Sequence, residues 1–424
     1  MHPASTDLNV SARAAKAASK RLAYLATDIK DRALLAIADG LIAREEQILA
    51  ANRLDYSAGE KSGMSDAMLD RLLLTPDRIR AISSDVRSVA SLPDPVGETF
   101  EMRTLANGLQ VGKRRVPLGV IGAVYESRPN VTVDISVLCL KSGNATVLRG
   151  GKEAMNSNLA LARVIQSAAY EAGVPDGAVQ LIESTDRALV GELLQMRDSI
   201  DLVIPRGGAE LISYVAQNAT MPVITGGIGV CHTYVDRTAD IAKAVAIAYN
   251  AKVQRPTVCN ALDTLLVHSE TAHSFLPLVA KEWGSAGVEM HCDQRALEII
   301  GPVPSSRVVA ASHEDWGKEF LALIGAIKVV DSLEEALEHI ERHGSGHSEA
   351  IVTEDYSAAM RFLAEVDAAC VYVNASTRFT DGGQFGLGAE VGISTQKFHA
   401  RGPLGLRELT TYKWIVLGSG QVRS

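Results

Sequence analysis

The sequence predicts an α/β protein built on parallel sheets. Two stretches of the chain, roughly 119–204 and 233–373, alternate short apolar strands with helical segments. A helical region and then a basic hairpin precede the first of these stretches. Strands that alternate with helices are typical of a doubly wound sheet, whose ligands bind at the carboxyl ends of the strands. Functional residues are therefore expected where these strands end.

The composition limits the classes of function. A net charge of −8 over 424 residues disfavours nucleic acid or an anionic membrane as a partner. The five cysteines lie far apart without a CxxC pair, which argues against structural zinc and against a disulfide framework. No apolar run is long enough to span a bilayer, and no secretory signal is apparent. We therefore expect a soluble cytoplasmic protein.

The first hundred residues are expected to form packed helices. Apolar residues recur at helical spacing from Leu34 to Ile42. Asn107-Gly108 then predicts a hairpin turn between extended flanks. The basic triplet Lys113-Arg-Arg115 indicates a solvated strand edge more often than a phosphate contact.

Three strand ends in the first α/β stretch carry unusual polar residues. Their sequences are Tyr125-Glu-Ser-Arg-Pro-Asn130, Arg149-Gly-Gly-Lys152 and Pro205-Arg-Gly-Gly208. Glycine pairs beside a cation suit an anionic ligand, because backbone N–H groups approach it closely and the helix N-terminus adds positive potential. A tight turn with a solvated cation explains either junction about equally well. The chain has no GxGxxG fingerprint and no P-loop.

One cysteine, Cys259, lies just ahead of an apolar run, Leu262 to Val267, that predicts a buried strand. A nucleophilic cysteine needs a partly exposed, electropositive setting because the thiolate is the reactive form. Lys252 and Arg255 would supply positive charge. The alternative is that Cys259 is a buried, inert small hydrophobe.

Three histidines, His339, His343 and His347, are spaced by four residues. Gly344 and Gly346 would end the helix that carries the first two, so the three histidines are not expected to share one face. We therefore expect no metal site, and the histidines are better explained as cationic neighbours of a helix C-terminus.

Five segments, in this order, resemble the aldehyde dehydrogenase superfamily, and most closely a branch that reduces acyl phosphates. They are Tyr125–Asn130, Leu148–Gly151, Val230–Val235, Gln254–Asn260 and Val373–Arg378. The resemblance covers residues from about 15 to 417.

The resemblance implies an aldehyde dehydrogenase-like domain organisation. A Rossmann-type NADP-binding domain would span residues 1–228, interrupted by a β-hairpin oligomerisation arm at about 101–117. A second α/β catalytic domain would span residues 229–395. A C-terminal return and oligomerisation strand would span residues 396–424. A cleft between the two domains would bring the cofactor and the thiol together.

The resemblance also implies roles for single residues. Cys259 matches the nucleophile, and Asn130 matches the asparagine of the oxyanion hole. The implied cofactor-binding residues are Arg149, Gly150, Gly151, Arg206, Gly207 and Gly208. Arg149 stands where relatives have a lysine, and its guanidinium fork favours the 2′-phosphate of NADP(H).

Substrate contacts are predicted at charged residues near strand ends. Arg128, Arg255 and Arg378 are candidates for binding the anionic groups of the substrate, with Glu126 or Asp381 for its ammonium group. Arginines in such positions are also common structural ion-pair partners.

The implied activity is NADPH-dependent reduction of L-glutamyl 5-phosphate to L-glutamate 5-semialdehyde and phosphate through a cysteine thioester. This reaction is the second step of proline biosynthesis from glutamate. Hydrolysing relatives carry a glutamate that activates water, but the matching segment here, Thr225-Gly-Gly227, has none. That departure suits an enzyme whose thioester must be reduced and not hydrolysed.

The resemblance further implies a homo-oligomer, either dimer or tetramer, and functional coupling to glutamate 5-kinase. Two alternatives remain open from the sequence. One is a related enzyme that acts on another acyl phosphate or on an acyl-CoA. The other is a catalytically inactive binding protein on the same fold.

Overall fold

The computed structural model describes residues 3–226, 228–304 and 306–423. The chain forms two compact units. The first unit comprises Met1–Gly226, Gly386–Gly392 and Leu404–Ser424, and the second comprises Gly227–Phe385 and Ile393–Pro403. The segment predicted as a C-terminal return is therefore shared between the units.

Five helices begin the first unit, as the sequence predicts. They are α1 (Pro3–Leu22), α2 (Thr27–Ala43), α3 (Glu45–Lys61), α4 (Asp66–Leu72) and α5 (Pro76–Ser91). The Thr75 side chain accepts a hydrogen bond from the Arg78 N–H, and Pro76 takes the first helical position of α5, so the local sequence starts this helix. The buried face of α2 contains Leu34, Ile37 and Leu41 and packs on α5 and α7.

A four-stranded parallel sheet with the order β5-β4-β3-β6 follows in the first unit. Its strands are β3 (Val120–Tyr125), β4 (Ala145–Gly150), β5 (Val179–Leu181) and β6 (Leu202–Arg206). The helices between and after them are α6 (Asn130–Lys141), α7 (Met155–Glu171), α8 (Ala188–Leu193) and α9 (Ala209–Asn218). Every residue of β3 and β4 is buried, as expected for central strands of a parallel sheet.

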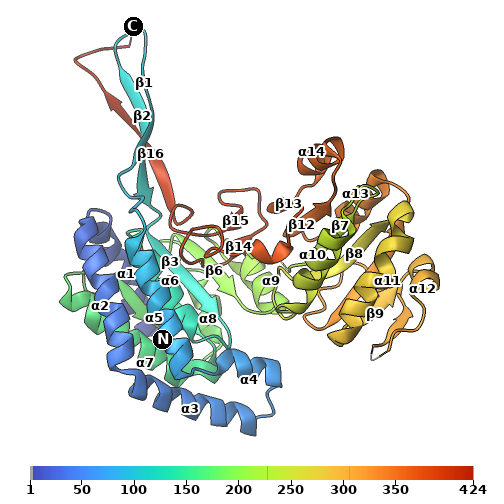
Figure 1. The fold of residues 1–424 in the computed structure, drawn as a ribbon. Coiled ribbons are helices and arrows are strands. Elements are labelled where there is room, and N and C mark those ends of the chain that lie inside the picture. The colour runs from blue at the N-terminus through green and yellow to red at the C-terminus, as the bar shows by residue number, and fades with distance from the viewer. Residues whose placement is uncertain (1–2, 227, 305, 424) are drawn as a thin grey trace. The chain divides into compact units, whose positions relative to one another are not determined.

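A narrow antiparallel arm extends from the first unit (Figure 1). It consists of β1 (Thr99–Thr104), β2 (Gln110–Pro117) and the C-terminal strand β16 (Thr410–Leu417), which pairs with β2. The predicted hairpin at Asn107-Gly108 is confirmed, since the turn joins β1 to β2. Lys113 forms an ion pair with Glu101 and lies 4.6 Å from the ring centre of Tyr412, so this cation is part of the strand surface.

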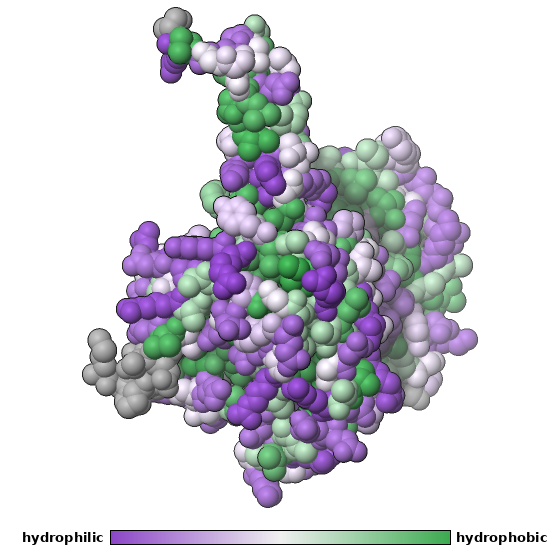
Figure 2. All heavy atoms as spheres, turned by 90° about the vertical axis from the view of Figure 1, so that its left-hand side faces the viewer, coloured by the Kyte–Doolittle hydropathy of each residue, from purple (hydrophilic) through white to green (hydrophobic). Residues whose placement is uncertain are grey.

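The arm exposes apolar side chains, which Figure 2 shows along its length. The side chains of β16 that are exposed include Trp414, Val416 and Leu417, each 55–56% accessible. Exposed apolar strands favour pairing with another chain. In this chain β16 pairs with its own β2, and the oligomer itself stays a prediction.

The second unit contains a seven-stranded, all-parallel sheet with the order β10-β9-β11-β8-β7-β12-β13. Its strands are β7 (Cys231–Val235), β8 (Leu262–His268), β9 (Glu289–Cys292), β10 (Val308–Ala310), β11 (Ile324–Val330), β12 (Ser348–Val352) and β13 (Cys370–Val373). The helices are α10 (Ile241–Val253), α11 (Ser269–Ser285), α12 (Gln294–Ile300), α13 (Leu333–His343) and α14 (Tyr356–Glu365). The short strands β14 (Ile393–Ser394) and β15 (Gly402–Pro403) form a separate antiparallel pair. The predicted α/β class is confirmed.

Within the described ranges, no helix has the length and apolar character needed to cross a membrane.

Trp283, on the buried face of α11, is the largest fully buried side chain among the described residues and belongs to the core of the second unit. We expect Trp283→Ala to lower the free energy of unfolding by about 3–5 kcal/mol, because it leaves a large cavity. Urea unfolding followed by circular dichroism would measure the loss. Phe398→Ala, at a side chain that is 92% exposed, should change the free energy of unfolding by less than about 0.5 kcal/mol. Equal effects of the two substitutions would contradict this assignment of the core.

Candidate active site

Cys259 lies in the turn that joins α10 to the buried strand β8, as the sequence predicts. Its side chain is partly exposed, whereas the other four cysteines are buried. A buried, inert thiol is the alternative for Cys259, and partial exposure disfavours it. The thiol therefore meets the accessibility that a nucleophile needs.

A close backbone approach holds this turn in place. A Cβ atom added at Gly229 would lie 2.6 Å from the Cα of Cys259, so only glycine fits there. The Cys231 thiol donates a hydrogen bond to the carbonyl oxygen of Cys259 at 3.2 Å. The Gly229 N–H in turn donates to the Glu319 carboxylate at 3.1 Å. The segment before β7 and the cysteine turn thus form one rigid piece of backbone.

Two arginines give the thiol its positive surroundings. The Nε of Arg378 donates to the side-chain oxygen of Gln254 at 2.8 Å, which ties Arg378 to the cysteine segment. Burial lowers the pKa of Arg378 below its ordinary value, the nearby charge of Arg255 adds to that effect, and the Cys259 thiolate opposes it. Both guanidinium groups therefore act on the same region as the thiol. A thiolate is stabilised by such cations.

The sequence predicts that Lys252 adds positive charge beside the thiol, and this prediction is wrong. Its side chain is fully buried, with Nζ 2.7 Å from the carbonyl oxygen of Ile324 and 3.6 Å from the Asp263 carboxylate. The reason is helical geometry, because Lys252 falls on the buried face of α10. Its charge is paired inside the core.

Side chains behind the cysteine turn join it to the segment after β13. Asn260 Nδ2 donates to the Thr380 carbonyl oxygen at 2.8 Å, and the Thr377 hydroxyl donates to the Asn260 carbonyl oxygen at 2.8 Å. These bonds bring together two segments that the sequence analysis singled out separately. Arg378 is positioned as a result, since it lies within the short helix that Thr377 begins.

The three histidines do not form one group. The rings of His339 and His343 lie 4.6 Å apart, while Nδ1 of His347 contacts the Ser348 hydroxyl at 2.8 Å and lies 3.9 Å from the Cys231 sulfur. Burial lowers the pKa of His347 to about 4, so this ring is neutral at physiological pH. Across the described ranges, no set of three histidine, cysteine or acidic side chains is arranged to hold a metal ion.

A cavity of about 520 Å³ lies in the first unit where β3 and β4 end. Its volume falls within the range that small-molecule and cofactor sites occupy. Three cations line it: Arg149, Lys152 and Arg187. Of the predicted cofactor-binding residues, Arg149 and Gly151 line the cavity. Arg206 does not, and its guanidinium group lies against Gly392: a Cβ atom added at Gly392 would lie 2.8 Å from Nη1 of Arg206.

The hydrogen bonds of Arg149 leave one donor of its guanidinium group without a partner. Its two terminal nitrogens donate to the carbonyl oxygens of Gly150, Thr185 and Asp186 at 3.0–3.3 Å. Its Nε is buried and has no hydrogen-bond partner. Burial is the main reason that the pKa of Arg149 lies below its ordinary value. An unsatisfied buried donor that belongs to a cation suits an anionic ligand.

The glycines of this region lie against neighbouring side chains. An added Cβ at Gly151 would overlap the Glu153 carboxylate, and one at Gly207 would overlap the Glu126 carboxylate and lie 2.8 Å from Leu211. The Gly208 N–H donates to the Glu126 carboxylate at 2.9 Å. Glu126, a candidate for the substrate ammonium, is thus engaged with the start of α9. Gly150 is packed against Asn158 and Tyr125.

Asn130 and Arg128 belong to the first unit, in the junction between β3 and α6. Asn130 is the first residue of α6, and its Nδ2 donates to the Asp134 carboxylate at 2.9 Å. Arg128 lies two residues before the helix. The structure therefore groups Arg255 with Arg378 in the second unit and places Arg128 in the first.

Arg187 and Tyr214 are among the lining residues of the cavity that the sequence did not point to. Arg187 immediately precedes α8, and Tyr214 lies within α9. Neither belongs to a glycine pair or follows a strand directly, so the sequence offered no local signal for them.

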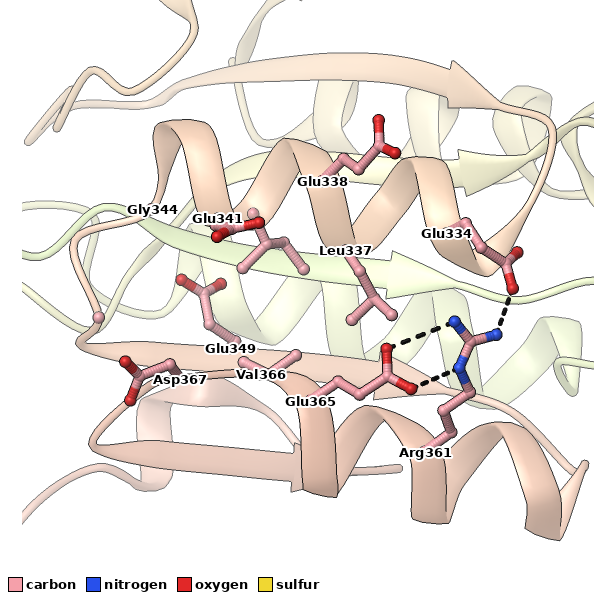
Figure 3. Close-up of a pocket in the computed structure, with 12 residues that line it drawn as sticks. Glu334, Leu337, Glu338, Glu341, Gly344, Glu349, Arg361, Glu365, Val366 and Asp367 are labelled. Atoms are coloured by element: carbon pink, nitrogen blue, oxygen red, sulfur yellow. Dashed lines mark hydrogen bonds and ion pairs between the residues drawn. The ribbon is translucent and has the colours of Figure 1, made fainter.

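A second cavity, of about 460 Å³, lies between α13 and α14 in the second unit (Figure 3). Half of its lining residues are acidic, but Arg361 bridges Glu334 and Glu365, and Glu349 is paired with His232 inside the sheet. Its charges are thus largely satisfied within the unit, and Cys259 is not among its lining residues.

Comparison with known proteins gives a consistent result over the full chain. A model described as "Aldehyde dehydrogenase family" matches residues 3–315 and 307–415. A gamma-glutamyl phosphate reductase of Dehalococcoides mccartyi is 61% identical over 423 residues, 100% of both chains. One of Chloroflexus aurantiacus is 57% identical over 421 residues, 99% of this chain and 100% of the relative. The crystal structure of gamma-glutamyl phosphate reductase from Thermotoga maritima matches with a TM-score of 0.94 at 49% identity, covering 98% of this chain and 100% of that one.

The contact between Gly229 and Cys259 can be tested by alkylation. We expect Gly229→Ala to slow the reaction of Cys259 with iodoacetamide by tenfold or more (about 1.4 kcal/mol in the barrier), because the new methyl group displaces the turn. Mass spectrometry of the modified peptide would measure the rate. Ile228→Ala, beside it at a side chain that is 46% exposed, is the matched control and should react like the wild type. Unchanged alkylation of Gly229→Ala would show that the turn tolerates displacement.

Proposed function

This chain belongs to the aldehyde dehydrogenase family, and on that basis we propose that it reduces L-glutamyl 5-phosphate to L-glutamate 5-semialdehyde and phosphate with NADPH. It is an oxidoreductase, and the proposed reaction is the second step of proline biosynthesis from glutamate. The substrate is the one that the names of its full-length relatives indicate. The observation that carries the chemistry is the partly exposed Cys259 thiol, held in a rigid turn beside Arg255 and Arg378.

The first chemical step that we propose is attack of the Cys259 thiolate on the acyl carbon. A thioester forms, the bond to the phosphate oxygen breaks, and the phosphate leaves without much acid assistance because it is a stable anion. Arg255 and Arg378 would favour the thiolate before attack and the anionic groups of the substrate during it.

Negative charge develops on the acyl oxygen in this step. We propose that the Asn130 amide and the backbone N–H of Cys259 donate hydrogen bonds to that oxygen. Each such donor contributes about 2.7–4 kcal/mol of transition-state stabilisation in comparable acyl-transfer enzymes. Arg128, in the same β3–α6 junction as Asn130, remains a candidate for an anionic group of the substrate.

The thioester must survive until it is reduced. The segment that matches the water-activating glutamate of hydrolysing relatives has no carboxylate at Thr225 or Gly226, and Gly227 lies outside the described residues. Glu319 lies near the cysteine turn, but its carboxylate accepts the Gly229 N–H and anchors the backbone. Slow hydrolysis is therefore part of the proposal.

The family uses a nicotinamide cofactor, and the cavity of the first unit fits its phosphates. Arg149, Lys152 and Arg187 would hold the phosphate groups, and three cations favour NADP(H) over NAD(H). Three carboxylates, Glu126, Glu153 and Glu210, line the same cavity, and the first two accept hydrogen bonds from the Gly208 and Ser127 N–H groups. The charges of Glu126 and Glu153 also act on Arg149, whose Nε still lacks a hydrogen-bond partner. When bound, the reduced nicotinamide supplies the hydride that converts the acyl group to the aldehyde.

Further parts of the proposal concern assembly and location. The exposed apolar surface of the arm supports a homo-oligomer, dimer or tetramer, joined through β16. Functional coupling to glutamate 5-kinase would protect the reactive acyl phosphate from water. The cytoplasm is the compartment in which such a pathway is expected, and in which five described cysteines that form no disulfide with one another are expected.

The reaction can be tested in its oxidative direction. We expect wild-type protein to reduce NADP⁺ with glutamate semialdehyde only when phosphate is present, and Cys259→Ala to lose this turnover. Absorbance of the reduced cofactor at 340 nm measures it. Cys292→Ala, at a buried cysteine of the same unit, is the control that should keep turnover once its folding is verified. Turnover without phosphate would mean that the thioester is hydrolysed. Turnover that needs added CoA in place of phosphate, with transfer of the glutamyl group to CoA, would favour the acyl-CoA alternative.

The cofactor cavity gives a separate prediction. Arg187→Gln and Lys152→Gln should each raise KM for NADP⁺ by about tenfold or more, because a charge-assisted hydrogen bond contributes roughly 1.5–3 kcal/mol. The KM for NAD⁺ should rise less if either cation meets the 2′-phosphate. Arg163→Gln, at an exposed arginine of α7 that does not line the cavity, is the matched control. Equal KM values for all three variants would exclude this cavity as the phosphate site.

A further inference from the structure

We propose that Asp134 is a positioning residue that orients the side-chain amide of Asn130, so that the nitrogen of this amide is presented as a hydrogen-bond donor. The inference rests on the proposed role of Asn130 in stabilising the acyl oxygen. It adds a residue that neither the sequence motifs nor the names of the relatives assign.

The orientation follows from the chemistry of the two side chains. Asn130 begins α6, and Asp134 lies one turn later on the same face, where side chains four residues apart meet. The Asn130 Nδ2 donates to the Asp134 carboxylate at 2.9 Å. An ionised carboxylate only accepts hydrogen bonds, whereas an amide can donate from one end and accept at the other. The carboxylate therefore selects the nitrogen end, and the second N–H of that nitrogen is left for another acceptor.

The ionised form of Asp134 is disfavoured at its position in α6. It lies in the second turn of α6, beyond the first turn where a helix N-terminus favours acidic residues most. Loss of water raises the pKa of Asp134 to about 7, and the like charge of Asp85 on α5 raises it further, while the Asn130 hydrogen bond and the Arg206 charge on β6 oppose this. A carboxyl kept where its ionised form is disfavoured is better explained by a role in the site than by a contribution to folding.

The raised pKa gives the orientation a pH dependence. Above about pH 7 the carboxyl is ionised and holds the amide nitrogen. Below that pH it is protonated, and a protonated acid can donate to the amide oxygen instead. Both orientations of Asn130 then become possible, and a share of the molecules loses the donor as the pH falls.

A double-mutant cycle tests the inference through kcat/KM between pH 6 and 9. Asp134→Asn can both donate and accept, so it no longer selects one end of the Asn130 amide. We expect kcat/KM to fall about tenfold to a hundredfold at pH 8. In an Asn130→Ala background, the same substitution should have no further effect, because Asp134 acts only through Asn130. Additive losses in the double variant would overturn the inference.

The pH profile supplies a readout that a structural role would not move. Thiolate formation also lowers the rate in acid, so the measured quantity is the ratio of wild type to Asp134→Asn. That ratio should shrink towards one as the pH falls below about 7. Asp85→Asn is the matched control. It removes the like charge beside Asp134, so kcat/KM of this variant should begin to fall at a lower pH than that of the wild type, while kcat/KM at pH 8 stays the same. A ratio that does not vary with pH would overturn the inference.

Folding is checked separately. Because ionised Asp134 is disfavoured in the folded protein, Asp134→Asn should melt at an equal or higher temperature than the wild type at pH 8. If that variant does not fold, Asp134→Ser carries the same expectation for the pH ratio. Asn130→Ala with wild-type kinetics would remove the proposed role of Asn130 and this inference with it. A slow Asn130→Ala beside a wild-type-like Asp134→Asn would overturn the inference alone.

Discussion

The contact between Gly229 and the backbone of Cys259 is the constraint on which the candidate chemistry depends. A side chain at residue 229 would occupy the space of the cysteine turn, and the Cys231 thiol fixes the carbonyl of the same turn from within the sheet. A nucleophile gains from such rigidity, because the entropy of placing the reacting sulfur is lost during folding and not during the reaction. The rigid turn also leaves the thiol partly exposed, although its neighbours in β7 and β8 are fully buried.

Charge is distributed differently around the two candidate sites. Beside the thiol the charges are two cations: Arg255 comes from the cysteine turn itself, and Arg378 comes from the segment after β13. In the cavity of the first unit, carboxylates and cations line the same space, but backbone N–H groups satisfy Glu126 and Glu153. The Nε of Arg149 still has no hydrogen-bond partner, so this cation keeps a donor for an anionic ligand, which a count of charged residues alone would not have indicated.

Polar groups that are kept at a cost in free energy mark where the structure serves a purpose other than stability. The orphaned Nε of Arg149 and the disfavoured charge of Asp134 both cost free energy in the folded protein. Lys252 is different, because its buried ammonium is matched by Asp263 and by two carbonyl oxygens, which explains it as part of the core. Whether a buried charged group belongs to the core or to a site thus depends on whether its hydrogen-bond and ion-pair partners are present, and only the folded structure shows these partners.

The sequence by itself determined the order and type of the main elements, the hairpin of the arm and the place of Cys259 ahead of a buried strand. These features follow from local periodicity and turn chemistry, which act between residues close along the chain. The tertiary structure decided which side chains meet: Arg378 reaches the cysteine segment, Arg187 and Tyr214 line the cavity, and Lys252 turns into the core. Such partnerships join residues far apart in the sequence, so no local spacing encodes them, and they appear only when helices and strands pack.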